Sequence, residues 1–335
     1  MKPKVSFIIQ AHNEGKIIAN CLRSLEAIRA YFPAIEVVAG LDGCTDNTLE
    51  VVRGFPNVKI VEARERIGKT ETENRGIAAA TGDIIWVIWA DEMVVADRES
   101  MEWLVKAFEE DPKLGGIVYP QVDRFNLEES IDKVKGLLML GDAWVPRFII
   151  EYKEKYYTKK VGARLYVDRN KMEMPFMVDI FRRKAIPRVS SVDDDAEICA
   201  ELLAKGYEIL LGREGECPYK TDSMSMRTAS GKPSYVPQPR TFLQMVRQKA
   251  RGQFGRFQLE PKYRLGMAYY PKMGWYSLTH LWEIKKRRLE CVAGILLWFL
   301  VAFVAIFPAA YYRLLNKQSA EIWGGSQTPR TTAQP

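Results

Sequence analysis

The 335-residue sequence predicts an α/β fold with a mostly parallel sheet flanked by helices. Short apolar runs of strand length alternate with segments whose apolar residues recur at helical spacing. The spacing leaves room for one crossover helix between successive strands, which is typical of βαβ units and right-handed connections. With 47% hydrophobic and 27% charged residues, the chain can bury one large domain or two modest ones.

The N-terminal third supplies most of the expected elements. The first expected helix, 17–31, has apolar residues at helical spacing, and Asp46 or Thr45 is placed to cap a later helix that begins near Thr48. Strands are expected at 5–9, 35–41, 58–61, 84–89 and 116–122, and the other helices run to Ala80 and over 101–110.

The stretch GDIIWVIWADE, residues 82–92, places two acids directly after a strand-length apolar run. In open parallel sheets, ligands bind beyond the carboxyl ends of the strands, so Asp91 and Glu92 are expected at a binding site. Carboxylate oxygens suit Mg²⁺ or Mn²⁺, and a diphosphate would provide further oxygens. The alternative to a binding site is an ordinary solvated strand end, and residues elsewhere in the chain distinguish the two.

The middle of the chain is harder to interpret. Residues 123–175 mix aromatic, aliphatic and basic side chains, which fits a lid or membrane-surface segment, or an amphipathic helix packed on the sheet. A strand is expected at 176–182. An acidic turn, Asp193 to Asp195, then opens a helix that ends at Gly206.

The C-terminal part of the chain differs in composition from the rest. A basic helical segment from Thr241 and an aromatic stretch at 262–282 lead to KKRR, and residues 291–312 carry no charge. Twenty-two residues of helix span about 33 Å, enough for a hydrocarbon core, and the basic cluster would place the preceding chain in the cytoplasm. A buried soluble helix is the alternative. The predicted units are a catalytic domain at 1–230, an interfacial segment at 231–288, a transmembrane helix at 289–313 and a flexible tail at 314–335.

Charge and cysteine content narrow the class of protein. The net charge of +7 fits nucleic acid or a membrane surface, and the late basic residues lie beside the predicted span, where anionic lipid accounts for them without nucleic acid. The five cysteines are far apart and only two histidines are present, so no zinc site is expected and the thiols should be reduced. The N-terminal apolar run is too short for a secretion signal.

Three acidic sites require one explanation: Asp42, the Asp91 and Glu92 pair, and the Asp193 to Asp195 turn. The segments SFIIQAHNEGKII, GLDGCTDNT, NRGIAAATGDIIWVIWADE, DDDAEICAELLAKGYEI and RQKARG follow in order. Together they closely resemble glycosyltransferase family 2 over residues 5 to 256. The resemblance implies a GT-A fold and an inverting enzyme that uses a nucleotide sugar and a divalent metal.

The resemblance also implies roles for individual residues. Asp195 matches the catalytic base, with Asp194 in place of the preceding glutamate, and Asp91 matches the metal-binding carboxylate, with Glu92 beside it. The acceptor side would include Gln248 and Arg182. The nucleotide sugar would contact Ala11, Asn13, Glu14, Asp42, Lys69, Ala90, Asp91 and Arg251.

Four positions depart from the family pattern: Trp89 at the first aspartate of D-x-D, Leu41, Gln10 and Gly252. Because Trp89 cannot bind a metal as an aspartate would, Asp91 would have to provide more of the metal binding. Gly252 stands at the tryptophan of Q-x-x-R-W, which makes processive polymerisation less certain.

The expected function is transfer of a sugar from a nucleotide diphosphate sugar, with UDP as the favoured nucleotide. The acceptor would be a lipid-linked or polysaccharide hydroxyl at the cytoplasmic membrane face. One span is too few for a secretion channel, so polymer export would require a homo-oligomer or a partner. Two alternatives are a degenerate, membrane-anchored scaffold that binds nucleotide sugars, and a nucleotidyltransferase. The latter would need a glycine-rich phosphate loop after the first strand, where AHNEG offers one glycine.

Overall fold

The computed structural model describes residues 4–119, 127–171, 173, 175–186, 188–213, 215–222, 226–227, 233–234, 240–263 and 269–315. The first half contains β1 (Val5–Ala11), α1 (Ile18–Tyr31), β2 (Ile35–Asp42), α2 (Thr48–Arg53), β3 (Val58–Ala63), α3 (Lys69–Ala79), β4 (Ile84–Trp89), β5 (Glu92–Val95), α4 (Arg98–Glu110), β6 (Leu114–Val118), α5 (Leu127–Ser130) and α6 (Leu137–Tyr156). The second half contains β7 (Thr158–Val161), β8 (Arg164–Val167), β9 (Ile180–Arg182), α7 (Asp194–Ala204), β10 (Glu208–Leu211), β11 (Tyr219–Asp222), β12 (Met226–Arg227), β13 (Pro233–Ser234), α8 (Phe242–Tyr263), α9 (Tyr269–Thr279), α10 (Arg288–Val304) and α11 (Ile306–Leu314).

The main sheet has nine strands in the order β3-β2-β1-β4-β9-β6-β10-β8-β7. Strands β3, β2, β1 and β4 are parallel, as are β6 and β10, whereas β9 is antiparallel to both of its neighbours. The register pairs Ala11 with Leu41, and Gln10 with Trp89. The carboxyl ends of β1, β2 and β4 therefore form one edge, as the sequence predicts.

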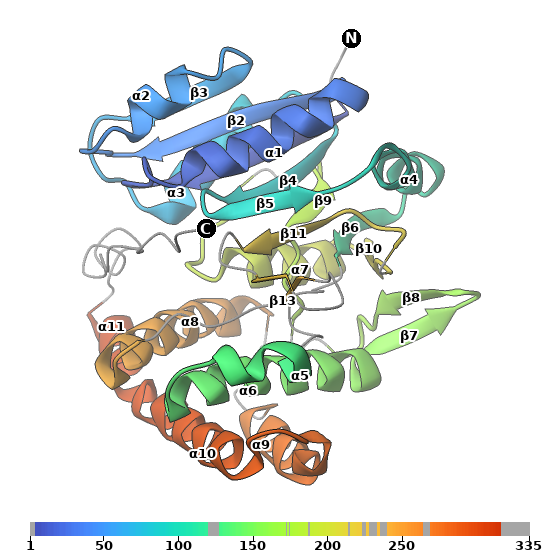
Figure 1. The fold of residues 1–335 in the computed structure, drawn as a ribbon. Helices are drawn as coiled ribbons and strands as arrows, with labels where there is room; N and C mark the ends of the chain where they lie inside the picture. The colour runs from blue at the N-terminus through green and yellow to red at the C-terminus, as the bar shows by residue number, and fades with distance from the viewer. Residues whose placement is uncertain are drawn as a thin grey trace.

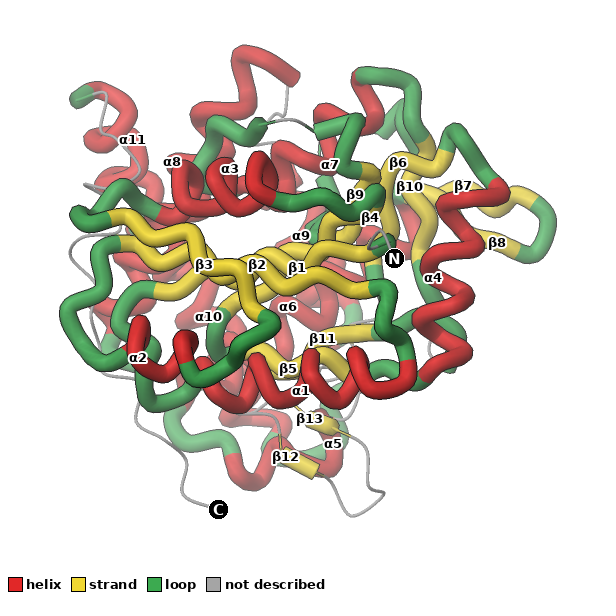
Figure 2. Tube along the Cα trace, turned by 90° about the horizontal axis from the view of Figure 1, so that it is seen from above, coloured by secondary structure: helices red, strands yellow, loops and turns green. Residues whose placement is uncertain are grey.

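Helices cover both faces of this sheet, with α3 and α7 on one side and α1 and α2 on the other (Figure 2). Successive residues of β1 serve opposite faces: Phe7 and Ile9 join the core on one side, and Ile8 joins the core on the other. This alternation follows from strand geometry. It explains why the central strands are continuously apolar in sequence.

A second layer of helices lies below the sheet domain, formed by α6, α8, α9, α10 and α11 (Figure 1). It has its own apolar core, centred on Trp144, Phe148 and Ile295. Where α6 crosses α10 the backbones approach closely, because a Cβ on Gly141 would lie 2.2 Å from the carbonyl oxygen of Gly294. Glycine at this contact allows the two helices to pack.

Several expectations need correction. The strand expected at 176–182 is only Ile180–Arg182 and runs antiparallel, and the helix expected from residue 101 begins at Arg98, after an Asp97 and Ser100 capping box. The strand expected to reach residue 122 ends at Val118, and 120–126 lie outside the described residues. Of the two proposed caps, Asp46 accepts the Thr48 backbone N–H at 3.0 Å, but the N-cap position of α2 is Asn47, whose side chain makes no capping hydrogen bond.

The uncertain middle segment contains the helix α6, which packs mainly on the C-terminal apolar helix rather than on the sheet. Residues Arg288–Leu314 are long and apolar enough to cross a membrane, by length and composition alone. Most of the predicted tail, from residue 316, lies outside the described part of the chain.

Candidate active site

Two loops at the carboxyl edge of the sheet hold each other in place. Asn13, in the left-handed region with φ of 56°, accepts the Thr45 backbone N–H at 2.8 Å. The Glu14 backbone N–H donates to the Thr48 hydroxyl at 2.8 Å. Ala11 ends β1 directly before this loop. The predicted nucleotide residues of the first loop thus rest on the loop that follows β2.

Asp42 organises the loop that leads to Lys69. Its buried Oδ1 accepts the backbone N–H groups of Ile67 at 2.6 Å and Gly68 at 3.0 Å. Gly68 has a φ of 88°, where a residue with a Cβ would be strained. The turn delivers Lys69 to the first position of α3.

Lys69 joins three segments that the sequence assigns to one site. Its Nζ lies 2.6 Å from Oδ1 of Asp194, at the start of α7, and 5.1 Å from the ring centroid of Trp89, at the end of β4. Burial alone would lower the pKa of Lys69, but the charge of Asp194 outweighs burial and raises it. Lys69 is therefore an ammonium ion between the donor and base segments.

Glu73 extends this network on α3. It is fully buried, accepts a hydrogen bond from Gln10 Nε2 at 2.6 Å, and interacts with Asp194. Burial, reinforced by the charge of Asp194, raises the pKa of Glu73 well above its usual value. Gln10, which departs from the family pattern, thus bonds to a buried carboxyl group that lies one turn along α3 from Lys69.

The acidic turn before α7 is fixed from both sides. Glu197 Oε2 accepts the backbone N–H groups of Ser190 at 2.7 Å and Ser191 at 2.6 Å, and Arg256 of α8 bonds to Asp193 Oδ2 at 2.9 Å. Burial and the charges of Asp193 and Asp194 raise the pKa of Asp195 well above its usual value. A base with a raised pKa has more driving force to take a proton.

The turn after β4 is held by Lys220 of β11. Its Nζ lies 2.9 Å from Glu92 Oε2, 3.2 Å from Asp179 Oδ2 and 5.4 Å from the Trp89 ring centroid. Glu92 Oε2 also accepts the Trp89 backbone N–H at 2.8 Å. Burial raises the pKa of Glu92 to about 7, although Lys220 opposes this. Trp89 itself is 42% exposed, and the ammonium groups of Lys69 and Lys220 both lie over its ring.

A divalent metal at the turn after β4 would be held by Asp91, which is buried two residues beyond the end of that strand. Glu92, the next residue, is bonded to Lys220. Within the described ranges, no three His, Cys, Asp or Glu side chains are grouped to hold a metal. A single carboxylate fits Mg²⁺ or Mn²⁺ if a diphosphate supplies the remaining oxygens. The prediction for Glu92 requires its carboxylate to leave Lys220.

Two predicted residues lie on α8. Gln248, Arg251 and Gly255 are spaced for one face of a helix. Gly255 packs on the acidic turn before α7, because a Cβ on Gly255 would lie 2.5 Å from Asp193 Cβ. Gln248 and Arg251 thus share the face that is directed at α7, although Gln248 also accepts a hydrogen bond from Arg240 at 3.0 Å.

Arg182 is not brought to this edge, which corrects its expected place at the acceptor. The register pairs it with Ile84 at the start of β4, about 17 Å along the strand from Trp89. Its guanidinium donates to the carbonyl oxygens of Phe108 at 2.8 Å and Leu114 at 3.1 Å. Arg182 therefore ties α4 to β6 at the opposite edge of the sheet.

Four residues that contact the candidate site were not predicted from the sequence: Glu73, Asp179, Lys220 and Arg256. Glu73 precedes the apolar Ile77 by four residues, and this helical spacing was a usable signal in the sequence, since it places a charged residue on the inward face of α3, where such residues are rarely buried without a role. Lys220 and Asp179 carry no local signal, because their contacts come from chain segments distant in sequence.

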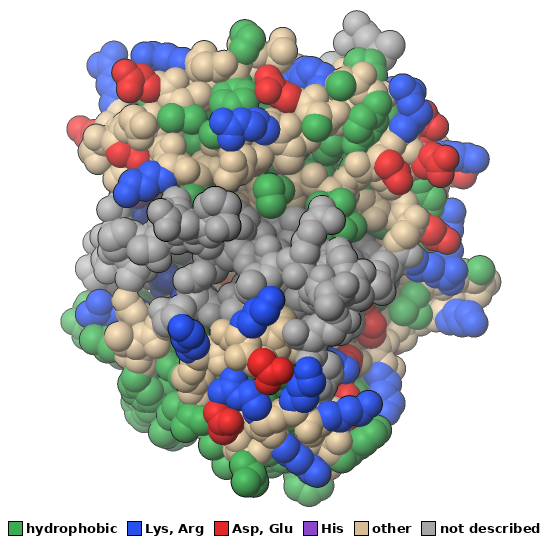
Figure 3. All heavy atoms as spheres, viewed as in Figure 1, with side chains coloured by type: hydrophobic (Ala, Val, Ile, Leu, Met, Phe, Trp, Pro, Cys, Tyr) green, Lys and Arg blue, Asp and Glu red, His purple; other side chains and the backbone are tan. Residues whose placement is uncertain are grey.

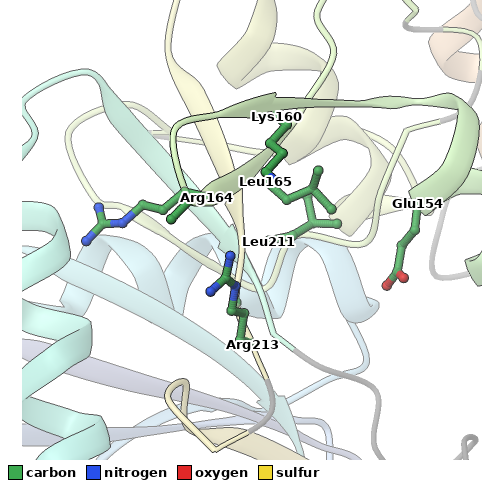
Figure 4. Close-up of a pocket in the computed structure, with 8 residues that line it drawn as sticks. Glu154, Lys160, Arg164, Leu165, Leu211 and Arg213 are labelled. Atoms are coloured by element: carbon green, nitrogen blue, oxygen red, sulfur yellow. The ribbon is translucent and has the colours of Figure 1, made fainter.

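A separate hollow of about 290 Å³ lies beside the β7–β8 hairpin. In Figure 4, Arg164 and Arg213 lie on one side of Leu165 and Leu211, and Glu154 lies on the other. None of the predicted site residues line this hollow.

A mostly parallel central sheet with helices on both faces (Figure 2) is the arrangement of a GT-A fold. Residues 6–175 match the family model "Glycosyl transferase family 2", and the chain belongs to that family. It resembles poly-beta-1,6-N-acetyl-D-glucosamine synthases of Staphylococcus epidermidis, at 27% identity, and Staphylococcus aureus, at 28%. Each match covers 116 residues, which are 34% of this chain and 27% of the relative.

A solved structure supports the fold. A Pyrobaculum calidifontis mannosyltransferase in complex with GDP-Man and Mn²⁺ superposes with a TM-score of 0.57, covering 95% of this chain and 89% of that chain. The sequences are 17% identical, so this similarity concerns the fold alone.

Proposed function

We propose that the chain is an inverting glycosyltransferase that transfers a sugar from a nucleotide diphosphate sugar, with UDP-sugars as the first candidates, to a hydroxyl group. The observation that carries this is the position of Lys69, bonded to Asp194 and set over Trp89. It supports a single site made of the predicted donor and base segments. The other proposed donor contacts are Ala11, Asn13, Glu14, Asp42, Ala90, Asp91 and Arg251.

Asp195 acts as the base in this proposal. It takes the proton of the acceptor hydroxyl as that oxygen attacks the sugar C1 from the face opposite the diphosphate. The C1–oxygen bond to the diphosphate breaks in the same displacement, so the anomeric centre inverts. Asp194 remains paired with Lys69 and keeps a negative charge beside the base.

Asp91 would hold the divalent ion, and Mg²⁺ or Mn²⁺, when bound, supplies positive charge for the departing diphosphate. The Pyrobaculum calidifontis mannosyltransferase, solved in complex with GDP-Man and Mn²⁺, supports the use of a divalent metal by analogy of fold. Arg251, on the α8 face directed at α7, would add a fixed charge near the diphosphate. Gln248, on that same face, is the acceptor-side residue.

The proposed acceptor is a lipid-linked glycan or a growing polysaccharide at the cytoplasmic membrane face. Two observations support it: the polysaccharide synthases among the relatives, and the apolar C-terminal segment. A homo-oligomer would be required if the product is an exported polymer.

The test is a screen of UDP-, GDP- and other nucleotide sugars with the full chain in membrane extracts, scored by nucleoside diphosphate release and product mass. Release from one donor, with a product one sugar heavier, is expected. Trp89, which stands where a carboxylate was expected, favours a second candidate, a scaffold that binds nucleotide sugars without transfer. Binding of a nucleotide sugar with no release from any donor would establish the scaffold instead.

A further inference from the structure

The outward face of the C-terminal helices is a continuous apolar stripe. The exposed large hydrophobic side chains of α10 and α11 recur at intervals of seven, four, three, four, four and three residues: Leu289, Leu296, Leu300, Phe303, Phe307, Tyr311 and Leu314. Figure 3 shows hydrophobic side chains along the lower edge of the molecule, where Figure 1 places α9 and α10. These intervals are typical of one face of a helix that lies on an apolar medium.

The inward face is bonded to the rest of the protein. Trp298 Nε1 donates to Asp142 of α6 at 3.0 Å, and Gln253 Nε2 of α8 donates to the Ala302 carbonyl at 2.7 Å. Of the most apolar 18-residue window, 39% is buried inside the protein. The helix is therefore one wall of a folded layer, with lipid access from one side.

These contacts conflict with a transmembrane orientation. Trp298 and Ala302 fall near the middle of Arg288–Leu314, which would be the centre of the bilayer. Their partner helices carry Asp142, with Lys249 at 3.1 Å, and Arg256, one turn from Gln253. Arg256 is bonded to Asp193, so a spanning helix would draw charged helices and the acidic turn to hydrocarbon depth.

The flanks of the stripe carry side chains suited to a membrane surface. Trp275 and Trp282 are 71% and 67% exposed, and tryptophan is favoured at the headgroup level. Lys285, Lys286 and Arg288 are exposed at the start of α10. Basic residues beside an apolar stripe match the charge of a leaflet that contains anionic headgroups.

We propose that residues 288–314 lie along the surface of one anionic leaflet, with the stripe in the interface, and do not span the bilayer. This inference deepens the membrane location in the proposed function and rests on it. It places both ends of the segment on the side of the catalytic domain. The acidic edge of the sheet would then remain in water, in reach of soluble nucleotide sugars and of acceptors at the leaflet surface.

The test is a depth measurement on the full chain, reconstituted in vesicles of phosphatidylcholine and phosphatidylglycerol. Single cysteines replace Leu289, Leu300 or Tyr311 in a Cys44→Ser background, carry a nitroxide label, and are read by oxygen and nickel-complex accessibility. Cys44 is the one partly exposed native thiol among the described residues. Lys16→Cys, exposed and away from the stripe, is the water reference.

Similar shallow depths at all three positions are expected. A maximum at position 300 with shallow values at 289 and 311 would show a span and overturn the proposal, as would water-like accessibility at all three. This readout does not depend on sugar transfer, so an inactive protein with a flat depth profile would refute the proposed function alone.

The charge match is tested by cosedimentation of the native-cysteine protein with the same vesicles. Changing Lys285 and Lys286 to Gln should weaken binding roughly thirtyfold, since each basic residue near such a surface contributes about 1 kcal/mol. Changing Lys16 and Lys106 to Gln removes equal charge elsewhere and should leave binding unchanged. Equal losses in both variants would contradict a specific anionic contact.

Discussion

The Lys69 ammonium lies 2.6 Å from the Asp194 carboxylate, joining residues 125 positions apart in the chain. The same ammonium lies over Trp89, so this ion pair connects the end of β4 to the start of α7. Because Asp194 is buried, loss of its cation would leave an uncompensated charge inside the protein.

Replacing Lys69 with Met should destabilise the fold by about 3 kcal/mol at pH 7, because it leaves a buried carboxylate without its cation. Urea denaturation measures this. Lys4 is the matched control: it pairs with Glu109 at 2.7 Å, but the side chains are 44% and 55% exposed. Lys4→Met should cost less than about 1 kcal/mol. Equal losses in the two variants would show that burial of the pair does not matter.

Lys220 should show strong energetic coupling to Glu92. Lys220→Met leaves Glu92 and Asp179 buried without a cation and should cost about 3 to 5 kcal/mol. Adding Glu92→Gln removes one of the two stranded charges and keeps an oxygen for the Trp89 N–H, so the double variant should recover part of the loss. A double-mutant cycle measures the coupling. Additive losses would mean that the 2.9 Å contact has no energetic role.

The raised pKa of Glu92 predicts a pH dependence of stability. Burial raises its pKa in the folded protein to about 7, against an ordinary value of 4.5, so the folded state binds the proton more tightly than the unfolded state. The stabilisation from this group is present below pH 4.5 and is lost as pH rises to about 7, by up to about 3 kcal/mol. Glu92→Gln should remove this component from the unfolding free energy measured between those pH values. An unchanged profile would contradict it.

Much of the donor half of the fold could be predicted from the sequence. The strand at 84–89 is found with the predicted bounds, and the first two strands begin where expected, because apolar runs between polar turns define them locally. The insertion of β9 between β4 and β6 could not be predicted. Three residues of strand character do not reveal which edges they pair with.

The roles of the candidate site residues stay predictions, but part of their placement follows from local patterns. Lys69 begins α3 and Asp194 begins α7, and the structure brings these two residues together beside Trp89 at the end of β4. Arg182 was misplaced because strand direction, which decides the edge that it reaches, depends on long-range pairing. Lys220 was missed because β11 pairs with β5 across more than a hundred residues.

Asp91 is expected to determine metal binding. Asp91→Asn should abolish Mn²⁺ binding in the presence of nucleoside diphosphate, measured by the loss of the free-ion EPR signal, together with metal-dependent activity. Glu92→Gln should retain most Mn²⁺ binding, since Lys220 already occupies that carboxylate. Full activity of the unmutated protein in EDTA would refute the metal assignment.

The most direct test of the account compares Asp195→Asn with the unmutated protein, for nucleoside diphosphate release in the presence of acceptor and for nucleotide-sugar affinity. Loss of the base should lower release by about 10² to 10⁴, because proton removal from the acceptor is then unassisted. Nucleotide-sugar affinity should stay within about twofold, since Asp195 is assigned to the acceptor proton and not to the donor. Release near the unmutated rate would contradict Asp195 as the base and, with it, the proposed mechanism.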